Sequence, residues 1–255
     1  MQWDPEAYAR YGGERGRPFF DLVARIAADS PRRVVDLGCG PGNLTATLTD
    51  RWPSAMVEGL DSSPEMITRA REYTTGRMSF AVADAAQWVM PADADVVLGN
   101  AVLQWVPGHL ELLRDWAATL PTDGWLAFQI PGNFDSPSHR LLRELAESPR
   151  WRARLDGILR HDVVAEPLAY ADLLLSAGLA ADVWETTYLH ILLGGEPVLA
   201  WMRGTGLRPV LVALSSPDGE RFAAEYGALL RAAYPRTEHG TMFEFRRIFL
   251  IGHKP

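Results

Sequence analysis

The stretch that decides the fold is Val34-Val35-Asp36-Leu37-Gly38-Cys39-Gly40-Pro41-Gly42-Asn43. Its apolar residues predict a buried strand, and its glycines predict a tight turn that opens a helix. Because glycine has no Cβ, the backbone at Gly38 and Gly40 can approach a ligand closely. The G-x-G-x-G spacing differs from the G-x-G-x-x-G fingerprint that binds a pyrophosphate. Asp36 would repel phosphate but accept hydrogen bonds from an ammonium group, so the stretch predicts a nucleoside site without a pyrophosphate.

The next predicted strand also ends in an acidic residue. It spans Met56–Asp61, and the carboxylate of Asp61 can accept hydrogen bonds from both hydroxyls of a ribose. Ser62-Ser63-Pro64 then begins a helix, with a serine as N-cap and the proline in the first turn. We count Ser62 among the cofactor contacts, and we expect Met66 to face the adenine plane.

Two further predicted strands, residues 78–85 and 94–100, also carry a polar residue at or near their carboxyl ends. Asp84 and Ala85 end the first, where Asp84 can accept a hydrogen bond from the adenine amino group, and Asn100 ends the second. Strands of an open α/β sheet present their ligand contacts at their carboxyl ends, so these residues describe one site. S-adenosylmethionine carries a nucleoside and a zwitterionic amino-acid group but no phosphate, and it therefore fits this site.

Composition narrows the class of protein. The chain has 255 residues, a formal net charge of −7 and a single cysteine, Cys39, so it predicts a compact enzyme without intrachain disulfides. The acidic balance argues against a nucleic-acid partner, because phosphate binding needs a surplus of lysine and arginine. No secretory or membrane-spanning apolar run is evident, so we expect a cytoplasmic protein that does not bind membranes. The histidines lack zinc-site spacing, and no metal is expected.

The order of predicted elements indicates an α/β fold. We expect a Rossmann-like, seven-stranded, mostly parallel sheet with helices on both faces and an antiparallel last strand. Two helices should precede the first strand, one beginning at Asp4-Pro5 and one with an apolar stripe of Phe19, Leu22, Val23 and Ile26. Both should close over the cofactor. The expected core comprises residues 1–132, 167–193 and 241–255, and two insertions, 133–166 and 194–240, should form a mostly helical cap.

Arginine and aromatic residues in the second half indicate where an acceptor binds. In the predicted last strand, Arg247 shares a face with aromatic and aliphatic residues, so it needs a partner. That partner is either an acidic substrate or an internal carboxylate. Residues 181–192 place Tyr188 and His190 on one polar and aromatic face, typical of a pocket wall, although His190 also fits an ordinary strand histidine. Arg208 follows in the turn of residues 205–209.

The ordered motifs at Asp36 to Gly42, at Asp61, at Asp84-Ala85 and at Asn100 resemble those of class I S-adenosylmethionine-dependent methyltransferases. That resemblance covers the first half of the chain. Further segments extend a narrower resemblance, to the trans-aconitate 2-methyltransferases, over nearly the whole chain. They are Trp3-Asp4-Pro5, Glu14-Arg15, Leu103-Gln104-Trp105, Trp184 to His190, and Thr205-Gly206-Leu207-Arg208-Pro209. Two segments depart from that family's pattern: residues 150–161 form a longer insertion, and the loop before Phe243 differs.

The narrower resemblance implies methylation of one carboxylate of trans-aconitate to give the monomethyl ester. It also indicates a set of residues that bind the methyl acceptor, in which Arg208 and Arg247 hold the carboxylates that are not methylated. The other members of that set are Tyr8, Arg15, Trp105, Tyr188 and His190. A carboxylate is already ionised at neutral pH, so methyl transfer to it needs no general base, and we expect no catalytic acid or base.

Other functions remain open on the sequence. A methyltransferase acting on another small acid or on a natural product would carry the same cofactor motifs. A protein that binds S-adenosylmethionine without catalysis would carry them too, because cofactor motifs predict binding and not turnover. A nucleic-acid amino-methyltransferase is disfavoured, because Asn100-Ala101-Val102-Leu103 stands where its proline-rich motif would be. The sequence gives no indication of oligomeric state.

Overall fold

The structure is a computed structural model that describes residues 12–159 and 164–255. Its strands are β1 (Arg33–Leu37), β2 (Met56–Asp61), β3 (Met78–Val82), β4 (Val96–Asn100), β5 (Trp125–Pro131), β6 (Ala180–Leu192), β7 (Arg236–Thr237) and β8 (Gly240–His253). Its α-helices are α2 (Gly12–Val23), α3 (Asn43–Ala46), α4 (Leu48–Arg51), α5 (Pro64–Ala70), α6 (His109–Thr119), α7 (Pro137–Ala146), α8 (Arg152–Leu155), α9 (Pro167–Ser176), α10 (Pro197–Arg203), α11 (Arg208–Ala213) and α12 (Ser216–Ala233). Short 3-10 helices are η1 (Arg71–Tyr73) and η2 (Leu103–Trp105). None of the helices that the structure describes is long and apolar enough to cross a membrane.

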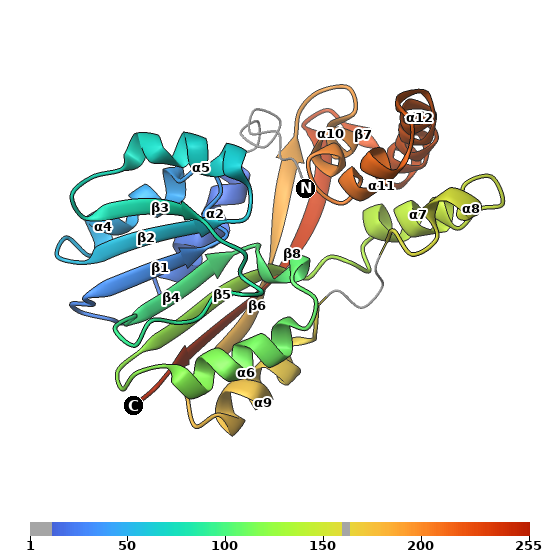
Figure 1. The fold of residues 1–255 in the computed structure, drawn as a ribbon. Helices are drawn as coiled ribbons and strands as arrows, with labels where there is room; N and C mark the ends of the chain where they lie inside the picture. The colour runs from blue at the N-terminus through green and yellow to red at the C-terminus, as the bar shows by residue number, and fades with distance from the viewer. Residues whose placement is uncertain (1–11, 160–163) are drawn as a thin grey trace. The chain divides into compact units, whose positions relative to one another are not determined.

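The strands form one mixed sheet in the order β3-β2-β1-β4-β5-β8-β6 (Figure 1). Neighbours from β3 to β5 run parallel, whereas β8 runs antiparallel to β5. The predicted Rossmann-like sheet with an antiparallel last strand is therefore confirmed. Over the described residues the sheet has eight strands, because the two-residue β7, which the sequence did not suggest, pairs with β8.

The described residues fall into two compact units. The first contains those up to Pro131, with Val164–Thr186 and Arg247–Pro255, and the second contains those of Gly132–Val163 and Thr187–Arg246. Strands β6 and β8 each continue from one unit into the other. Within the second unit, helices α7, α10 and α11 pack against the long helix α12. The cap role expected of the two insertions stays a prediction.

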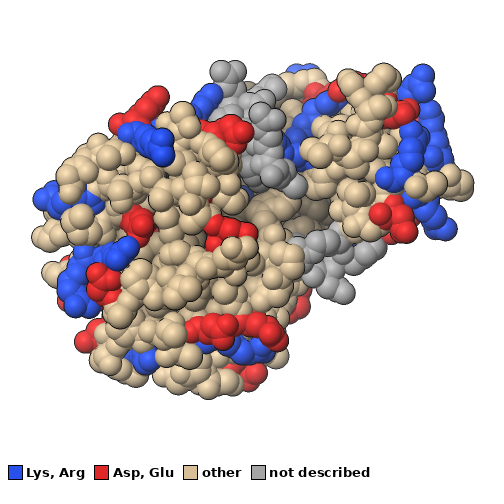
Figure 2. Space-filling model, viewed as in Figure 1, with Lys and Arg blue, Asp and Glu red and all other residues tan. Residues whose placement is uncertain are grey.

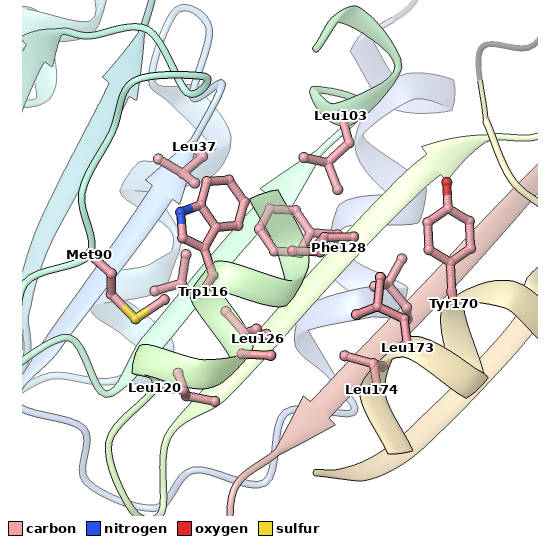
Figure 3. Packing of buried hydrophobic residues seen from close by; sticks show 14 of the residues in the cluster. Leu37, Met90, Leu103, Trp116, Leu120, Leu126, Phe128, Tyr170, Leu173 and Leu174 are labelled. Atoms are coloured by element: carbon pink, nitrogen blue, oxygen red, sulfur yellow. The ribbon is translucent and has the colours of Figure 1, made fainter. Parts of the chain in front are cut away.

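The main hydrophobic core lies on one face of the sheet in the first unit. Trp116 of α6 stacks on Phe128 of β5, with ring centroids 5.6 Å apart and an interplanar angle of 16° (Figure 3). Helix α9 adds Tyr170, Leu173 and Leu174 to the same cluster. Each fully buried side chain of this size stabilises the fold by roughly 1.5–3 kcal/mol. This packing fixes the strands and thereby the positions of their carboxyl ends.

Helix α2 belongs to the first unit and packs against β5. Its predicted apolar stripe is confirmed, because Phe19 and Leu22 are 1% and 0% exposed. The helix ends at Val23, so the buried Ile26 follows it rather than lying within it. The helix expected from Asp4-Pro5 lies outside the described residues.

Two predicted strand boundaries are wrong. The prediction continued β3 to Ala85, but the strand ends at Val82, opposite Asp61, the last residue of the neighbouring strand β2. The N–H of Ala83 still donates to the backbone oxygen of Asp61 at 3.0 Å, but β2 ends at Asp61, so the ladder between the two strands stops there. The prediction also began β4 at residue 94, whereas β4 begins at Val96, which lies opposite Val34 of β1.

Candidate functional site

The glycine turn that follows β1 has an unusual backbone. Gly38, Gly40 and Gly42 have φ angles of 73°, 57° and 80°, a region that other residues rarely adopt. An added Cβ would lie 2.7 Å from the Val102 side chain at Gly38 and 2.8 Å from Ala70 at Gly42, whereas at Gly40 it would meet no atom of a described residue within 4 Å. The outer glycines are thus required by packing inside the protein. At Gly40, by contrast, the described residues leave room beside the backbone.

Asp61 is tied to this turn by hydrogen bonds. The backbone N–H of Gly40 donates to Asp61 Oδ2 at 2.9 Å, and the N–H of Ser63 donates to Oδ1 at 2.8 Å. Burial raises the pKa of Asp61, and these two hydrogen bonds oppose that shift. Each carboxylate oxygen keeps a second lone pair. The arrangement leaves Asp61 able to accept hydrogen bonds from two vicinal hydroxyls beside Gly40.

Asp36 is the second carboxylate of the site. It lies on β1, is 2% exposed, and accepts a hydrogen bond of 2.6 Å from Thr45 Oγ1 of α3. Burial raises the pKa of Asp36 to about 7; the hydrogen bond from Thr45 opposes the shift, and the negative charge of Asp61 adds to it. Two neighbouring carboxylates with raised pKa values create a site that favours a cationic group.

Helix α5 begins as the sequence predicts. Ser63 is its N-cap, with its Oγ accepting from the N–H of Met66 at 3.3 Å, and Pro64 is in the first turn. Ser62 is exposed and precedes the cap. Met66 is only 3% exposed, so little of its surface is accessible for the predicted contact with adenine.

The three remaining cofactor candidates, Asp84, Ala85 and Asn100, differ in setting. Asp84 is exposed in the loop after β3 and forms a local turn, accepting from the N–H of Ala86 at 2.9 Å, while Ala85 is 9% exposed. Asp84 is therefore a loop residue rather than the predicted strand end. Asn100 does end β4, and within the described part of the chain its buried Oδ1 accepts no hydrogen bond. Ala101 follows with a φ of 59°, a strained angle for alanine.

The sequence-based reasoning missed Gln129, a buried amide on β5. Its Cα is paired with that of Asn100 on β4, so the two side chains leave the same face of the sheet. Arg247, paired with Pro131, lies on this face as well. Its Nη1 donates to Gln129 Oε1 at 3.2 Å, and both side chains are buried. The missed signal was a glutamine inside the apolar run Trp125 to Pro131.

The predicted inward phase of Arg247 is confirmed, because the side chain is 4% exposed. Trp105, also in the first unit, is on η2 and is 37% exposed. Tyr8 lies outside the described residues, and the side chain of Arg15 is not described although its backbone belongs to α2. Their predicted contacts with an acceptor stay predictions.

The second unit holds the other acceptor candidates. Tyr188 and His190 share a face of β6, as predicted, and are 2% and 6% exposed. The His190 ring stacks on Trp201, with centroids 5.2 Å apart. Arg208 is the half-buried first residue of α11. The near-complete burial of Tyr188 and His190 fits an aromatic core at least as well as a pocket wall.

Asn133 is a further buried polar residue of the second unit that sequence reasoning missed. It is 4% exposed, and neither amide atom of its side chain has a hydrogen-bond partner among the described residues. It follows β5 by two positions in the chain. A buried amide without partners is costly, by about 1–3 kcal/mol for each unsatisfied group, and so marks a position that a ligand could satisfy.

Several arginines of the second unit already have carboxylate partners. Arg150 pairs with Glu225 at 2.5 Å, and Arg154 pairs with Asp218 at 2.6 Å, which joins the segment around α8 to α12. Figure 2 shows Lys and Arg side chains gathered along the edge of this unit that carries α12. These surface pairs hold the helices together and leave Arg150 and Arg154 less suited to binding an acceptor. Among the described residues, no three His, Cys, Asp or Glu side chains are grouped so that they could hold a metal ion.

Comparisons with known proteins first establish the class. A family model described as a methyltransferase domain matches residues 11–180. Among solved structures, the fold resembles the YcgJ protein from Bacillus subtilis, with a TM-score of 0.60 and 16% identity over 92% of this chain and 98% of that one. It also resembles phosphoethanolamine N-methyltransferase 2 of Haemonchus contortus in complex with S-adenosyl-L-methionine, with a TM-score of 0.55 and 15% identity over 94% of this chain and 52% of that one. The solved structures show a Rossmann-like fold, and the family model places the chain among the methyltransferases.

Closer relatives then identify the family. A protein of Streptomyces avermitilis is 54% identical over 99% of this chain and 97% of its own length. A protein of Rhodococcus jostii is 52% identical over 98% of both chains. Both are named trans-aconitate 2-methyltransferase. The chain belongs to the trans-aconitate 2-methyltransferase family.

Proposed function

We propose that the protein methylates a carboxylate of trans-aconitate, with S-adenosylmethionine as the methyl donor, to give the monomethyl ester. The observation that carries the proposal is the 52–54% identity to proteins named for this reaction over nearly the full length of both chains. At such identity, the residues that surround a site are expected to be largely shared.

The proposed cofactor site comprises the acceptor groups around the glycine turn. Asp61 would hold the ribose hydroxyls, and Asp36 would face the ammonium group, directly or through water. Asp84 and Met66 would contact the adenine, and Ser62 and Ala85 would be further cofactor contacts. Asn100 would contribute its Oδ1, which has no partner among the described residues, at the end of β4. The supporting observation is the open side of Gly40 next to an Asp61 that is already oriented by two backbone N–H groups. When bound, S-adenosylmethionine supplies a methyl group activated by its positive sulfur.

The protein's task in the reaction is to position the acceptor. A carboxylate with a reference pKa near 4 is ionised at neutral pH, so no residue has to remove a proton from it. Arg247 and Arg208 are proposed to bind the spectator carboxylates, because a cation held on the attacking oxygen would lower its nucleophilicity. Trp105, Tyr188 and His190, with Tyr8 and Arg15, would shape the site and exclude water. A short, in-line approach of oxygen to methyl carbon then provides most of the rate enhancement.

The test is methyl transfer from S-adenosylmethionine with a labelled methyl group to a panel of mono-, di- and tricarboxylates, read by mass spectrometry. We expect one labelled methyl ester of trans-aconitate, with a higher kcat/KM than for any other acid in the panel. A matched Asp61→Ala variant should abolish the signal. Preferred transfer to a different acid would reassign the acceptor, and tight binding of S-adenosylhomocysteine without any transfer would indicate a binding protein.

A further inference from the structure

The buried polar groups on one face of the sheet in the first unit are divided by their chemistry. Hydrogen-bond acceptors lie on β1 and β4, where Asp36 and the Oδ1 of Asn100 leave the same face, because Asp36 is paired with Leu98 and Asn100 is two residues further on. Donors lie on β5 and β8, where Gln129 and Arg247 leave that face. A cationic group therefore suits the first half of this face, and an anionic group suits the second.

The contact with Arg247 fixes how the Gln129 amide is oriented. A guanidinium group only donates hydrogen bonds, so the atom of Gln129 that faces Arg247 Nη1 at 3.2 Å must be Oε1. The amide nitrogen, Nε2, therefore points elsewhere. Gln129 is 0% exposed, so its Nε2 is buried, and this atom has no hydrogen-bond partner among the described residues.

A desolvated amide N–H without an acceptor is unfavourable, and a carboxylate oxygen is the acceptor that would best compensate it. The neighbouring Asn100 Oδ1 also lacks a partner among the described residues, although it lies opposite in register. The donor Gln129 Nε2 and the acceptor Asn100 Oδ1 do not bond to each other, which is expected if each binds a different group of the ligands.

We propose that Gln129 determines acceptor specificity: its Oε1 positions the guanidinium of Arg247, and its Nε2 donates to the same spectator carboxylate of the acceptor. This inference deepens the proposed function and rests on it. The carboxylate would accept from the amide on β5 and from the guanidinium on β8. Gln129 itself takes no part in bond making, so its effect should appear in acceptor binding.

Two substitutions separate the roles of the amide. Gln129→Glu keeps an oxygen for Arg247 but removes the N–H donor and adds a negative charge that repels a carboxylate. Gln129→Met keeps the side-chain volume but removes both groups. The matched control is Tyr170→Phe, which deletes a buried hydroxyl of the same unit that lies 2.8 Å from His109 Nε2, in the core cluster on the opposite face of the sheet.

For each variant, KM and kcat are measured with trans-aconitate, the Kd of S-adenosylhomocysteine by calorimetry, and the melting temperature. We expect the acceptor KM to rise roughly tenfold in Gln129→Met and at least thirtyfold in Gln129→Glu, which is the loss of a charge-assisted hydrogen bond without and with added repulsion. The Kd should stay within about twofold, and Gln129→Glu should melt no lower than the wild type. Tyr170→Phe should lower the melting temperature and leave KM unchanged.

An unchanged KM in both Gln129 variants, with wild-type turnover intact, would overturn this inference and leave the proposed function standing. The converse case is read from binding. Suppose that the wild-type complex with S-adenosylhomocysteine binds trans-aconitate, that Gln129→Glu loses this binding, and that the wild type transfers no methyl group from S-adenosylmethionine. The proposed reaction then fails while the role of Gln129 holds. No binding of any di- or tricarboxylate to the wild-type complex would overturn both.

Discussion

Replacing Asp36 by asparagine removes a buried carboxylate whose titration is coupled to folding. Burial raises its pKa from the ordinary 3.8 to about 7, and a shift of about 3 units corresponds to about 4 kcal/mol. The folded state holds the proton more tightly than the unfolded state. The contribution of this proton to the free energy of unfolding of the wild type is therefore lost as the pH rises from about 4 through about 7. The Asp36→Asn variant has no such proton to lose, so its free energy of unfolding should lack the decline.

The assay is urea unfolding of the wild type and of Asp36→Asn at half-unit pH intervals from 4.5 to 8.5, without ligand. The quantity of interest is the free energy of unfolding of the wild type minus that of the variant. We expect it to fall by roughly 3 kcal/mol between pH 4.5 and 7.5, with a slope of at most about 1.4 kcal/mol per pH unit. An amide left unsatisfied in the variant would add a constant offset and leave the slope unchanged. Asp29→Asn, at an exposed aspartate, is the control for loss of one negative charge.

A second arm links this titration to the cofactor. Saturating S-adenosylhomocysteine carries an ammonium group that favours the ionised form of Asp36, so it should flatten the decline of the wild type. A difference between wild type and variant that does not depend on pH would refute the reasoning, because it would mean that Asp36 titrates alike in the folded and unfolded chains. A decline that the ligand leaves unchanged would place the ammonium group elsewhere.

Three further predictions concern the site. Gly40→Ala should cost about 1 kcal/mol of stability because of its positive φ, and it should weaken S-adenosylhomocysteine binding at least tenfold. Gly42→Ala, whose Cβ would lie 2.8 Å from Ala70, should chiefly lower the melting temperature. Similar losses of affinity in the two variants would contradict the assignment of Gly40 to the ligand. Asp61→Ala should weaken cofactor binding by roughly 2–4 kcal/mol in calorimetry, and an unchanged Kd would place the ribose elsewhere. Arg208→Lys and Arg247→Lys should each cost roughly 2–4 kcal/mol in kcat/KM for a tricarboxylate and less for a monocarboxylate. Equal losses for both acids would mean that these arginines are structural.

Much of the proposed cofactor site could be predicted from the sequence, because its backbone depends on the local order of residues. The strand, turn and helix around Gly38 to Gly42, the serine cap before Pro64 and the carboxylate of Asp61 all follow from residues near one another in the chain. The end of β3 at Val82, rather than at Asp84-Ala85, could not be predicted, since β3 stops where its neighbour β2 stops. Which neighbour a strand has is a non-local fact that periodicity does not contain.

The surroundings of the proposed acceptor residues could be predicted only in part. Alternation along β8 correctly placed Arg247 on the buried face, because side chains on a strand alternate whatever the strand's neighbours are. The partner of Arg247 was not predictable: Gln129 is 118 positions away and meets it through the antiparallel pairing of β5 with β8. The burial of Tyr188 and His190 in an aromatic stack likewise depends on Trp201, which a separate helix supplies.

The sequence by itself determined the α/β class, the glycine turn with its two carboxylates, and the apolar stripe of α2, because propensity, periodicity and turn chemistry are properties of short segments. Only the tertiary structure decided that Gly40 is the open glycine, that Asp61 is held by the turn, and that acceptors and donors divide one face of the sheet between Asn100 and Gln129. Burial, strand register and desolvation arise when distant segments pack together, and they set the pKa values and unsatisfied groups from which a site's chemistry follows.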